Sequence, residues 1–263
     1  MKAQVYKDPR PAEYFTPFHE RVRRGHQGWM YEFVRSMVTP YLLIFHRTRC
    51  IDSDRIPAQG SVIIAPNHFS FLDHFFSAIY TRRRVQFMAK SQLFKPPMQF
   101  IFSHGGVFPI RRGHRDEEGF ISAKAILGRG GTVVMYAEGG RSRTEDLSEQ
   151  AKPGIGRLAL ESGAAVVPTA IYGSQKARNW KRLQFPKVTV QYGTPLRFER
   201  VDNPSREQSQ AAADIIFERI RETYDGLAES GRARAVRASR AARRAAAAAQ
   251  RSAEAAGRRP VVR

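Results

Sequence analysis

The sequence predicts an α/β fold: a mixed, largely parallel sheet flanked by helices, with an N-terminal amphipathic helical segment. Short runs rich in β-branched and aromatic residues alternate with longer segments of helical periodicity. Such alternation is typical of strands joined by helical crossovers, which build parallel sheets. In addition, 263 residues with 42% hydrophobic content suffice for one full α/β core, so a second folded domain is not required.

The predicted elements divide the chain into three parts. Residues 1–46 form the amphipathic segment, residues 47–230 the folded domain, and residues 231–263 an Ala/Arg-rich basic tail that we expect to be poorly ordered. The tail could instead continue the last helix, since alanine and arginine both have high helix propensity. Strands are expected near residues 48–52, 61–65, 85–89, 106–110, 132–136, 165–171 and 187–192. Helices are expected near residues 71–80, 92–103, 117–128, 155–162 and 205–229.

The amphipathic pattern is clearest over residues 17–46. Apolar side chains recur there at steps of three and four residues, and a bend is expected at Pro40. Glu32 and Arg35 interrupt the apolar run, which argues against a membrane-spanning helix. Two interpretations remain: a helix packed on the domain's own core, or a helix in the lipid interface with Trp29 and Tyr41 at headgroup level.

The main candidate for chemistry is the stretch of residues 67–73, which follows an apolar run. It places His68 and Asp73 five residues apart. A carboxylate that holds one imidazole nitrogen leaves the other able to accept a proton, as a general base requires. Five helical residues span about 140° of rotation, so His68 is expected on the strand-to-helix loop and Asp73 in the first helical turn after Ser70. An ordinary capping box, with Asp73 bonded only to backbone N–H groups, would explain the same spacing.

Charged residues also follow other predicted strands. Arg111 follows the run 107–110, and the segment 138–143 follows the run 132–136. Sites in open α/β sheets form at the carboxyl ends of strands, so we expect these loops to meet the stretch 67–73. Pro109 lies inside one of the runs and predicts an edge strand or a strand end.

Four of these segments, in this order, resemble the motif blocks of the glycerolipid acyltransferase family, which includes bacterial 1-acylglycerol-3-phosphate acyltransferase. The blocks are Asn-His-x4-Asp at 67–73, Gly-x-Phe-x-x-Arg at 106–111, Glu-Gly-x-Arg-Ser at 138–142 and Val-Pro at 167–168. The similarity spans residues 47–195. Gly140 stands where the family usually has threonine, which should alter the stiffness of the loop more than its chemistry.

The resemblance implies a reaction and its substrates. A fatty acyl group would pass from a thioester carrier, acyl-CoA or acyl carrier protein, to the free hydroxyl of a lysophospholipid, without an acyl-enzyme. The expected acceptor is 1-acylglycerol-3-phosphate, which gives phosphatidic acid; another lysolipid or a glycerol phosphate is the alternative. No metal and no further cofactor are expected, and the remaining histidines and the single cysteine have no spacing typical of metal ligands.

The resemblance also implies roles for individual residues. His68 would be the general base and Asp73 would orient its ring. The acceptor phosphate would be bound by guanidinium and backbone groups, with Glu138 either holding Arg141 or meeting the acceptor itself. The expected phosphate-site residues are Arg111, Glu138, Gly139 and Arg141, and the supporting residues are Asn67, Ser142 and Pro168. Arg112 and Arg143 are expected to form a solvated basic rim.

Charge indicates where the protein works. Residues 228–263 hold ten arginines and two glutamates, so +8 of the formal net charge of +20 lies there. A basic residue close to an anionic leaflet contributes about 1 kcal/mol, so we expect peripheral or monotopic association with the cytoplasmic face of the cell membrane. The lone Cys50 excludes an intramolecular disulfide, and residues 1–11 contain no apolar run typical of a secretory signal.

A nucleic-acid-binding protein is the rival class, because a pI near 10.8 is the electrostatic footprint of such proteins. The basic residues are not interleaved with aromatic residues in any recognised binding module. We therefore expect no nucleic-acid partner.

Overall fold

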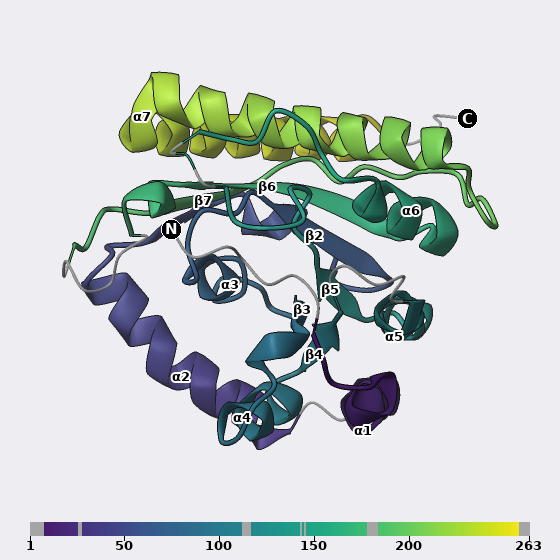
Figure 1. The fold of residues 1–263 in the computed structure, drawn as a ribbon. Helices are drawn as coiled ribbons and strands as arrows, with labels where there is room; N and C mark the ends of the chain where they lie inside the picture. The colour runs from purple at the N-terminus through teal and green to yellow at the C-terminus, as the bar shows by residue number, and fades with distance from the viewer. Residues whose placement is uncertain are drawn as a thin grey trace.

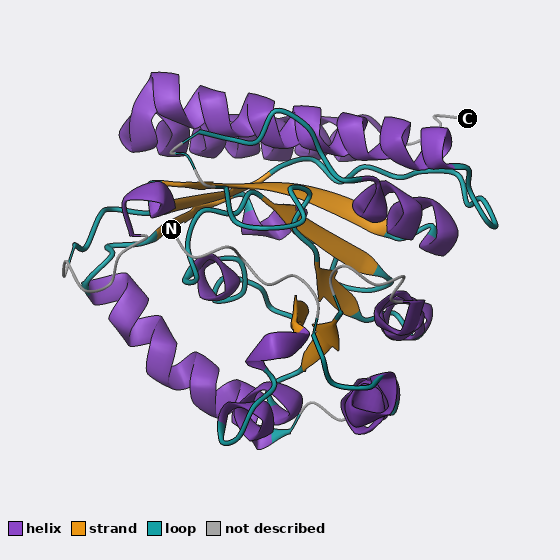
Figure 2. Cartoon of the chain, in the orientation of Figure 1, coloured by secondary structure: helices purple, strands orange, loops and turns teal. Residues whose placement is uncertain are grey.

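A seven-stranded sheet runs through the centre of the protein, with helices on both of its faces (Figure 1; Figure 2). The structure is a computed structural model that describes residues 8–25, 28–111, 117–142, 144, 146–177 and 184–257. The strands are β1 (Arg49–Ile51), β2 (Val62–Pro66), β3 (Gln86–Lys90), β4 (Val107–Ile110), β5 (Thr132–Val134), β6 (Ala165–Tyr172) and β7 (Thr189–Tyr192). Their order is β1-β7-β6-β2-β5-β3-β4, and every pair is parallel except β6 with β7. The predicted fold class is confirmed.

Strand β2 lies in the interior of this sheet and is buried on both sides. Its apolar run is continuous because each side chain has a core to enter, whichever way it points. Ile63 and Ala65 face the core formed with α1, α5, α6 and α7, whereas Val62 and Ile64 face the core formed with α2 and α3. The loop that follows β2 therefore starts from a rigid position.

The helices of the described residues are α1 (Thr16–Arg23), α2 (Trp29–Ile44), α3 (Asp73–Phe76), α4 (Met98–His104), α5 (Glu117–Gly128), α6 (Pro153–Ser162) and α7 (Arg206–Gly257). Short 3-10 turns cover Ala12–Phe15, Ser53–Arg55, Ser91–Leu93 and Ser174–Ala177. Helix α4 begins later than the expected residue 92, because Pro96 and Pro97 lack backbone N–H groups and Pro97 becomes the residue before the first turn.

Helix α3 is much shorter than expected. It ends at Phe76, and the chain then continues in turns up to Thr81. The Thr81 hydroxyl bonds the carbonyl oxygens of Ala78 and Arg83, which stabilises this turn in place of further helix. The apolar side chains of residues 75–79 are still buried or half-buried, so the hydrophobic pattern was correct and the helical length was not.

Helix α2 packs one side on the domain, as the first interpretation predicts, and exposes apolar side chains on the other side. Tyr31 and Leu42 are buried against the domain, and Arg35 donates hydrogen bonds to the carbonyl groups of Ile79 and Thr81. On the outer side, Trp29, Met37 and Ile44 are 67%, 63% and 67% exposed. The helix continues through Pro40. None of the described helices combines the length and the apolar character that a membrane crossing requires.

The expectation of a poorly ordered tail beyond residue 231 is corrected by the structure. Helix α7 changes direction at Gly231, whose φ is +69°, and continues as helix to Gly257. Glu222 and Ala242, twenty residues apart, line the same groove, so the second half of α7 turns back alongside the first. This half is docked on the domain: Arg232 bonds the Thr189 hydroxyl and the Val188 carbonyl.

Pro109 lies in β4, which is an edge strand of the sheet. A proline cannot donate to the hydrogen-bond ladder and is tolerated where one side of the strand is open. The prediction of an edge strand is confirmed.

Candidate active site

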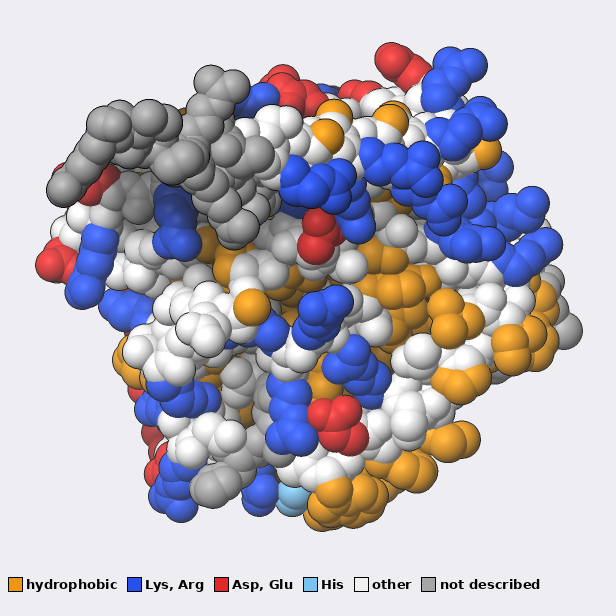
Figure 3. Space-filling model, turned by 180° about the vertical axis from the view of Figure 1, so that it is seen from behind, with side chains coloured by type: hydrophobic (Ala, Val, Ile, Leu, Met, Phe, Trp, Pro, Cys, Tyr) orange, Lys and Arg blue, Asp and Glu red, His pale blue; other side chains and the backbone are white. Residues whose placement is uncertain are grey.

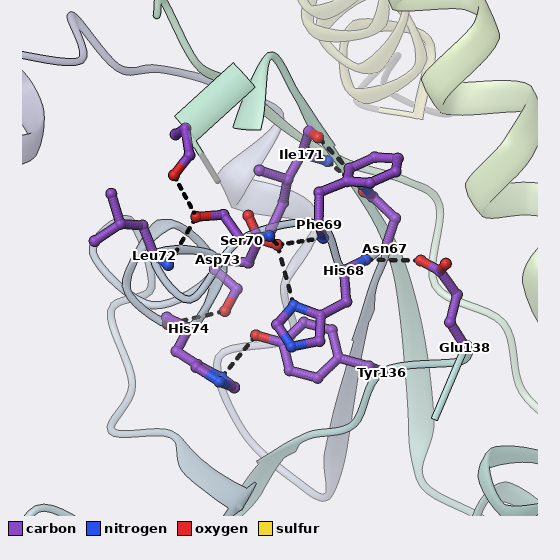
Figure 4. A network of polar contacts seen from close by, with 12 residues as sticks. Asn67, His68, Phe69, Ser70, Leu72, Asp73, His74, Tyr136, Glu138 and Ile171 are labelled. Atoms are coloured by element: carbon purple, nitrogen blue, oxygen red, sulfur yellow. Dashed lines mark hydrogen bonds and ion pairs between the residues drawn. The ribbon is translucent and has the colours of Figure 1, made fainter. Parts of the chain in front are cut away.

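The loop between β2 and α3 carries the candidate catalytic residues (Figure 4). Asn67 is fully buried at the start of this loop. Its side-chain amide donates to the Ile171 carbonyl at 3.2 Å, and its side-chain oxygen accepts from the Ile171 N–H at 2.7 Å. Asn67 therefore fastens the loop to β6, the neighbouring strand, and His68 follows from a fixed backbone position.

The His68 ring is held by Asp73. The distance from His68 Nδ1 to Asp73 Oδ2 is 3.1 Å, and the same carboxylate oxygen accepts the backbone N–H groups of Phe69 and Ser70, each at 2.7 Å. The capping box and the orienting contact thus coexist. Because an ionised carboxylate only accepts hydrogen bonds, Nδ1 carries the proton and Nε2 is the proton-accepting nitrogen. The His68 side chain is 8% exposed and that of Asp73 is fully buried.

The segment 138–148 holds the His68 backbone on both sides. Glu138 Oε1 accepts the His68 N–H at 2.7 Å, and the Ser142 N–H donates to the His68 carbonyl at 2.8 Å. Glu138 Oε2 accepts the Ser148 hydroxyl at 2.6 Å. Burial raises the pKa of the Glu138 carboxyl above its ordinary value, partly offset by these hydrogen bonds. The expected pairing of Glu138 with Arg141 is wrong, since this carboxylate binds the backbone of His68 and Ser148 instead.

Gly139 allows the turn that makes this possible. Its φ is +66°, a backbone conformation that residues other than glycine rarely adopt. A Cβ at this position would lie 2.9 Å from Lys152 Cγ. Gly139 is therefore required by the backbone between Glu138 and Ser142.

Tyr136 and His74 complete the site. The Tyr136 ring stacks on the His68 ring, with centroids 3.8 Å apart and planes inclined by 17°, and the Tyr136 hydroxyl lies 2.8 Å from His74 Nδ1. Burial and the nearby Asp73 charge hold the pKa of Tyr136 well above its usual range, so the phenol stays neutral. The stacked phenol covers one face of the His68 ring and restricts its rotation.

An apolar cavity of about 310 Å³ begins at His74. It lies between α2, α3, β3 and α4, and its lining is almost entirely apolar. The lining residues nearest in sequence to the catalytic loop are Phe71, His74 and Phe75. Its size falls within the range of small-molecule sites, roughly 300–1,000 Å³. The oriented His68 ring is thus linked to an apolar pocket. It stacks on Tyr136, the Tyr136 hydroxyl contacts His74, and His74 lines the pocket.

Residues 47–172 match the model of the Acyltransferase family. This range contains β1 to β6 and the hydrogen-bonded residues around His68, whereas α2, which forms one wall of the cavity, lies outside it. This part of the chain is an acyltransferase domain. The acyltransferase resemblance inferred from the four motif blocks is therefore confirmed, and the protein is an acyltransferase.

The fold is also that of a solved acyltransferase. The crystal structure of the 1-acyl-sn-glycerophosphate (LPA) acyltransferase PlsC from Thermotoga maritima superposes with a TM-score of 0.54 at 20% sequence identity. The match covers 80% of this chain and 88% of that one. At this identity the likeness concerns the arrangement of sheet and helices.

In this acyltransferase the predicted site residues divide into two groups. His68, Asp73, Glu138 and Ser142 are joined by direct hydrogen bonds, and Asn67 bonds the Ile171 backbone of β6. Pro168 lies within β6, paired with Ala65, and its carbonyl accepts the Gly193 N–H at 2.7 Å, so its part is structural.

The predicted phosphate-binding arginines form the second group. Arg111 follows β4 and donates to the Arg10 carbonyl at 2.9 Å, with its guanidinium beside the Phe15 ring. Arg141 is exposed and forms no ion pair with another described residue. Arg112 and Arg143 lie outside the described residues.

Sequence reasoning missed Tyr136, His74 and Ser148. The signal for Tyr136 was its place at the end of an apolar run just before Glu138; we assigned it to the strand, which in the structure ends at Val134. Nothing in the spacing of His74 or Ser148 indicates a role. Among the described residues, no group of three or more His, Cys, Asp or Glu is placed to hold a metal ion.

Proposed function

We propose that this acyltransferase moves a fatty acyl group from a thioester donor to the free hydroxyl of 1-acylglycerol-3-phosphate and so forms phosphatidic acid. The observation that carries the proposal is the contact of His68 Nδ1 with the buried Asp73 carboxylate at 3.1 Å, beside an apolar cavity. The Thermotoga maritima protein with the same fold is a 1-acyl-sn-glycerophosphate acyltransferase, which supports the choice of acceptor.

The proposed chemistry needs one base. His68 Nε2 takes the proton of the acceptor hydroxyl while the hydroxyl oxygen attacks the thioester carbonyl. Asp73 stabilises the imidazolium that forms. The tetrahedral intermediate then collapses, the C–S bond breaks, and the departing thiolate takes the proton from Nε2. A positioned general base contributes about 10²–10⁴-fold to the rate. No acyl-enzyme, metal or further cofactor takes part in this scheme.

The hydrogen bonds around His68 support this role. Its N–H, carbonyl and Nδ1 are each bonded to a different residue, Glu138, Ser142 and Asp73, and its ring is stacked on Tyr136. A base fixed in this way loses little entropy on reaching the transition state, which favours catalysis by alignment.

We assign the acceptor phosphate to Arg111, Arg141 and the backbone at Gly139. Guanidinium groups bind phosphate oxygens bidentately, and Arg141 is exposed at the turn that follows Glu138. We do not include Glu138 in the proposed phosphate site, because its two carboxylate oxygens accept hydrogen bonds from His68 and Ser148.

The apolar cavity is the proposed acyl-chain site. Its lining offers no charged partner for a headgroup apart from Arg35, whose guanidinium is bonded to two carbonyl groups. The donor is acyl-CoA or acyl carrier protein, either of which presents the chain as a thioester.

The enzyme is proposed to work on the cytoplasmic face of the cell membrane, as a peripheral or monotopic protein. Helix α2 exposes Trp29, Met37 and Ile44, and its inner side contributes Val34 and Val38 to the cavity wall. A bilayer against the outer side of α2 would lie next to the acyl-chain site. Drawing a palmitoyl-length chain of about 14 methylenes into water costs around 11 kcal/mol, so the substrates are best met at the lipid surface.

An acyl-transfer assay with a panel of lysophospholipids tests the function. Wild type is compared with His68→Ala and with His104→Ala, a control histidine on α4 whose ring stacks on Phe100. We expect the highest rate with 1-acylglycerol-3-phosphate, loss of most turnover in His68→Ala, and wild-type rates in His104→Ala. Transfer to a different lysolipid and not to 1-acylglycerol-3-phosphate would show that the proposed acceptor is wrong. An active His68→Ala variant would show that His68 is not the base.

A further inference from the structure

The second half of α7 presents one side to the domain. Arg232 bonds the Thr189 hydroxyl and the Val188 carbonyl, Ser239 and Arg243 bond the buried Asp52, and Val236 packs on the cluster around Leu227. At about 100° per residue these four positions fall on one side of the helix. These contacts fix the rotation of the helix about its own axis, and so they also decide which of its residues face away from the domain.

A row of arginines lies on a different side of the same helix. Arg237, Arg240, Arg244 and Arg251 recur at steps of three, four and seven residues and are all exposed. They fall within an arc of about 60°, centred about 100° around the helix from the docked side. We call these four residues the basic stripe.

No acidic side chain that the structure describes neutralises the basic stripe. Residues 232–252 contain seven arginines and no Asp or Glu. Two of the seven, Arg232 and Arg243, are used in docking. The stripe residues form no ion pair with any residue that the structure describes, whereas Arg157 and Arg219 pair with glutamates on their own helices or a neighbouring one. Four like charges on one ordered surface therefore face outward.

Basic side chains over α7 and apolar side chains over α2 share one face of the molecule. Figure 3 shows Lys and Arg side chains gathered along the upper right of this face, over α7, and apolar side chains toward its lower right edge, over α2. An apolar surface with an adjacent basic one complements the interface of an anionic bilayer, with acyl chains beneath phosphate groups.

We propose that the basic stripe is a second membrane contact, which binds the headgroups of anionic phospholipids. This second contact rests on the proposed function, because it requires an enzyme that works at a lipid surface. The side chains between the stripe arginines are alanine and serine apart from Arg243 and Gln250, and none is a large apolar residue, so this contact is electrostatic adsorption without insertion and must weaken with salt. Nucleic acid fits less well, because residues 232–257 contain no aromatic side chain on which a base could stack.

The test uses the full-length protein and sedimentation with vesicles. The stripe variant carries Arg237→Gln, Arg240→Gln, Arg244→Gln and Arg251→Gln. The control variant carries Arg197→Gln, Arg200→Gln, Arg206→Gln and Arg219→Gln, four exposed arginines outside the stripe, so each variant loses four of the same charges. Glutamine keeps the helix propensity of arginine, and circular dichroism checks that both variants are folded. The vesicles are phosphatidylcholine with and without about one third phosphatidylglycerol.

We expect the stripe variant to bind anionic vesicles at least about 30-fold more weakly than wild type, since each arginine near an anionic surface is worth about fivefold. The control variant should stay within about threefold of wild type, and a stripe variant with four Arg→Lys changes should do the same, because only point charge matters here. Binding to pure phosphatidylcholine should be the same in all four proteins.

Three outcomes would overturn the inference. Equal losses in the stripe and control variants would mean that net charge alone acts, and no loss in the stripe variant would remove the contact. A stripe variant that loses affinity for duplex DNA and keeps its affinity for vesicles would assign the stripe to nucleic acid. Acyl transfer in neutral detergent separates this result from the proposed function: both variants should be as active as wild type there, and a wild type inactive in that assay would count against the function and not against the stripe.

Discussion

His68 is held at four points, by Asp73 at Nδ1, Glu138 at N–H, Ser142 at the carbonyl and Tyr136 at the ring face. Each of these contacts limits a different motion of the imidazole. We therefore expect that removing each contact affects turnover and the free energy of unfolding to different degrees.

Asp73→Asn tests the orienting contact. The amide can offer an N–H to Nδ1 and so favour the wrong tautomer, and the two backbone N–H bonds weaken with the lost charge. We expect kcat to fall about 10²–10⁴-fold with KM nearly unchanged. Urea unfolding should show a loss of about 1–3 kcal/mol. A variant with normal kcat would mean that Asp73 only caps α3.

Tyr136→Phe separates the stacked ring from the hydroxyl. Phenylalanine keeps the stack on His68 and removes the bond to His74. We expect kcat within about threefold of wild type and a stability loss of about 0.5–1.5 kcal/mol, whereas Tyr136→Leu should lower kcat further because the ring face is lost. If Tyr136→Phe were as inactive as His68→Ala in the same assay, the phenol would take part in the chemistry itself.

Glu138 should leave a pH signature on stability. Burial raises the pKa of this carboxyl in the folded protein, so between its unfolded pKa near 4.5 and the higher folded value the native state binds more protons than the unfolded state. The contribution of Glu138 is therefore fully present below pH 4.5 and is lost as the pH rises through the folded pKa. Free energies of unfolding from urea titrations should fall less steeply above pH 4.5 in Glu138→Gln than in wild type. Parallel curves for the two proteins would contradict this account.

At the scale of elements, strand β3 has two sides with different tasks. Phe87 and Ala89 line the apolar cavity, while Met88 points to the opposite core. This alternation follows from the pleat of a strand and gives a matched pair of positions for testing the cavity.

Ala89→Leu should shorten the proposed acyl-chain site. The added carbons enter the cavity of about 310 Å³, so long-chain donors lose contact volume and short-chain donors do not. We expect the ratio of kcat/KM for long over short acyl donors to fall about tenfold, at about 1–3 kcal/mol for one or two methylenes in an apolar pocket. Met88→Leu, on the other side of the same strand, should leave the ratio unchanged. An unchanged ratio in Ala89→Leu would place the chain elsewhere.

The elements show what sequence reasoning can reach. All seven predicted strands exist, because their apolar runs are the direct consequence of burial in a covered sheet. The lengths of α3 and α4 were wrong because local features decide them, namely the Thr81 turn and the Pro96-Pro97 pair. The His68–Asp73 contact was predictable since both partners lie within five residues. The Glu138, Ser142 and Tyr136 contacts join segments about 70 residues apart, and no spacing rule reports them.

At the scale of the whole molecule, sheet, cavity and surface form one arrangement. The catalytic loop leaves an interior strand, the cavity extends from it toward α2, and α2 exposes an apolar surface. The second half of α7 adds charge to the same face, as Figure 3 shows. The docking of this half could not be predicted, because it depends on Asp52 and Val188, which lie far from it in the sequence.

The apolar contact should be separable from the electrostatic one. A variant with Trp29→Ser, Met37→Ser and Ile44→Ser loses exposed side chains on α2 and no charge. We expect it to bind vesicles of pure phosphatidylcholine at least about tenfold more weakly, since burial of one such side chain is worth about 1.5–3 kcal/mol. Vesicle sedimentation measures this, and undiminished binding to neutral vesicles would mean that α2 does not enter the lipid.

The central claim is that His68 is the base that activates the acceptor hydroxyl. It is tested most directly by the kcat of acyl transfer from acyl-CoA to 1-acylglycerol-3-phosphate in neutral detergent, measured for wild type and His68→Ala at equal folded concentration. The account predicts a fall of at least about 10²-fold. A His68→Ala enzyme that turns over at the wild-type rate would contradict it.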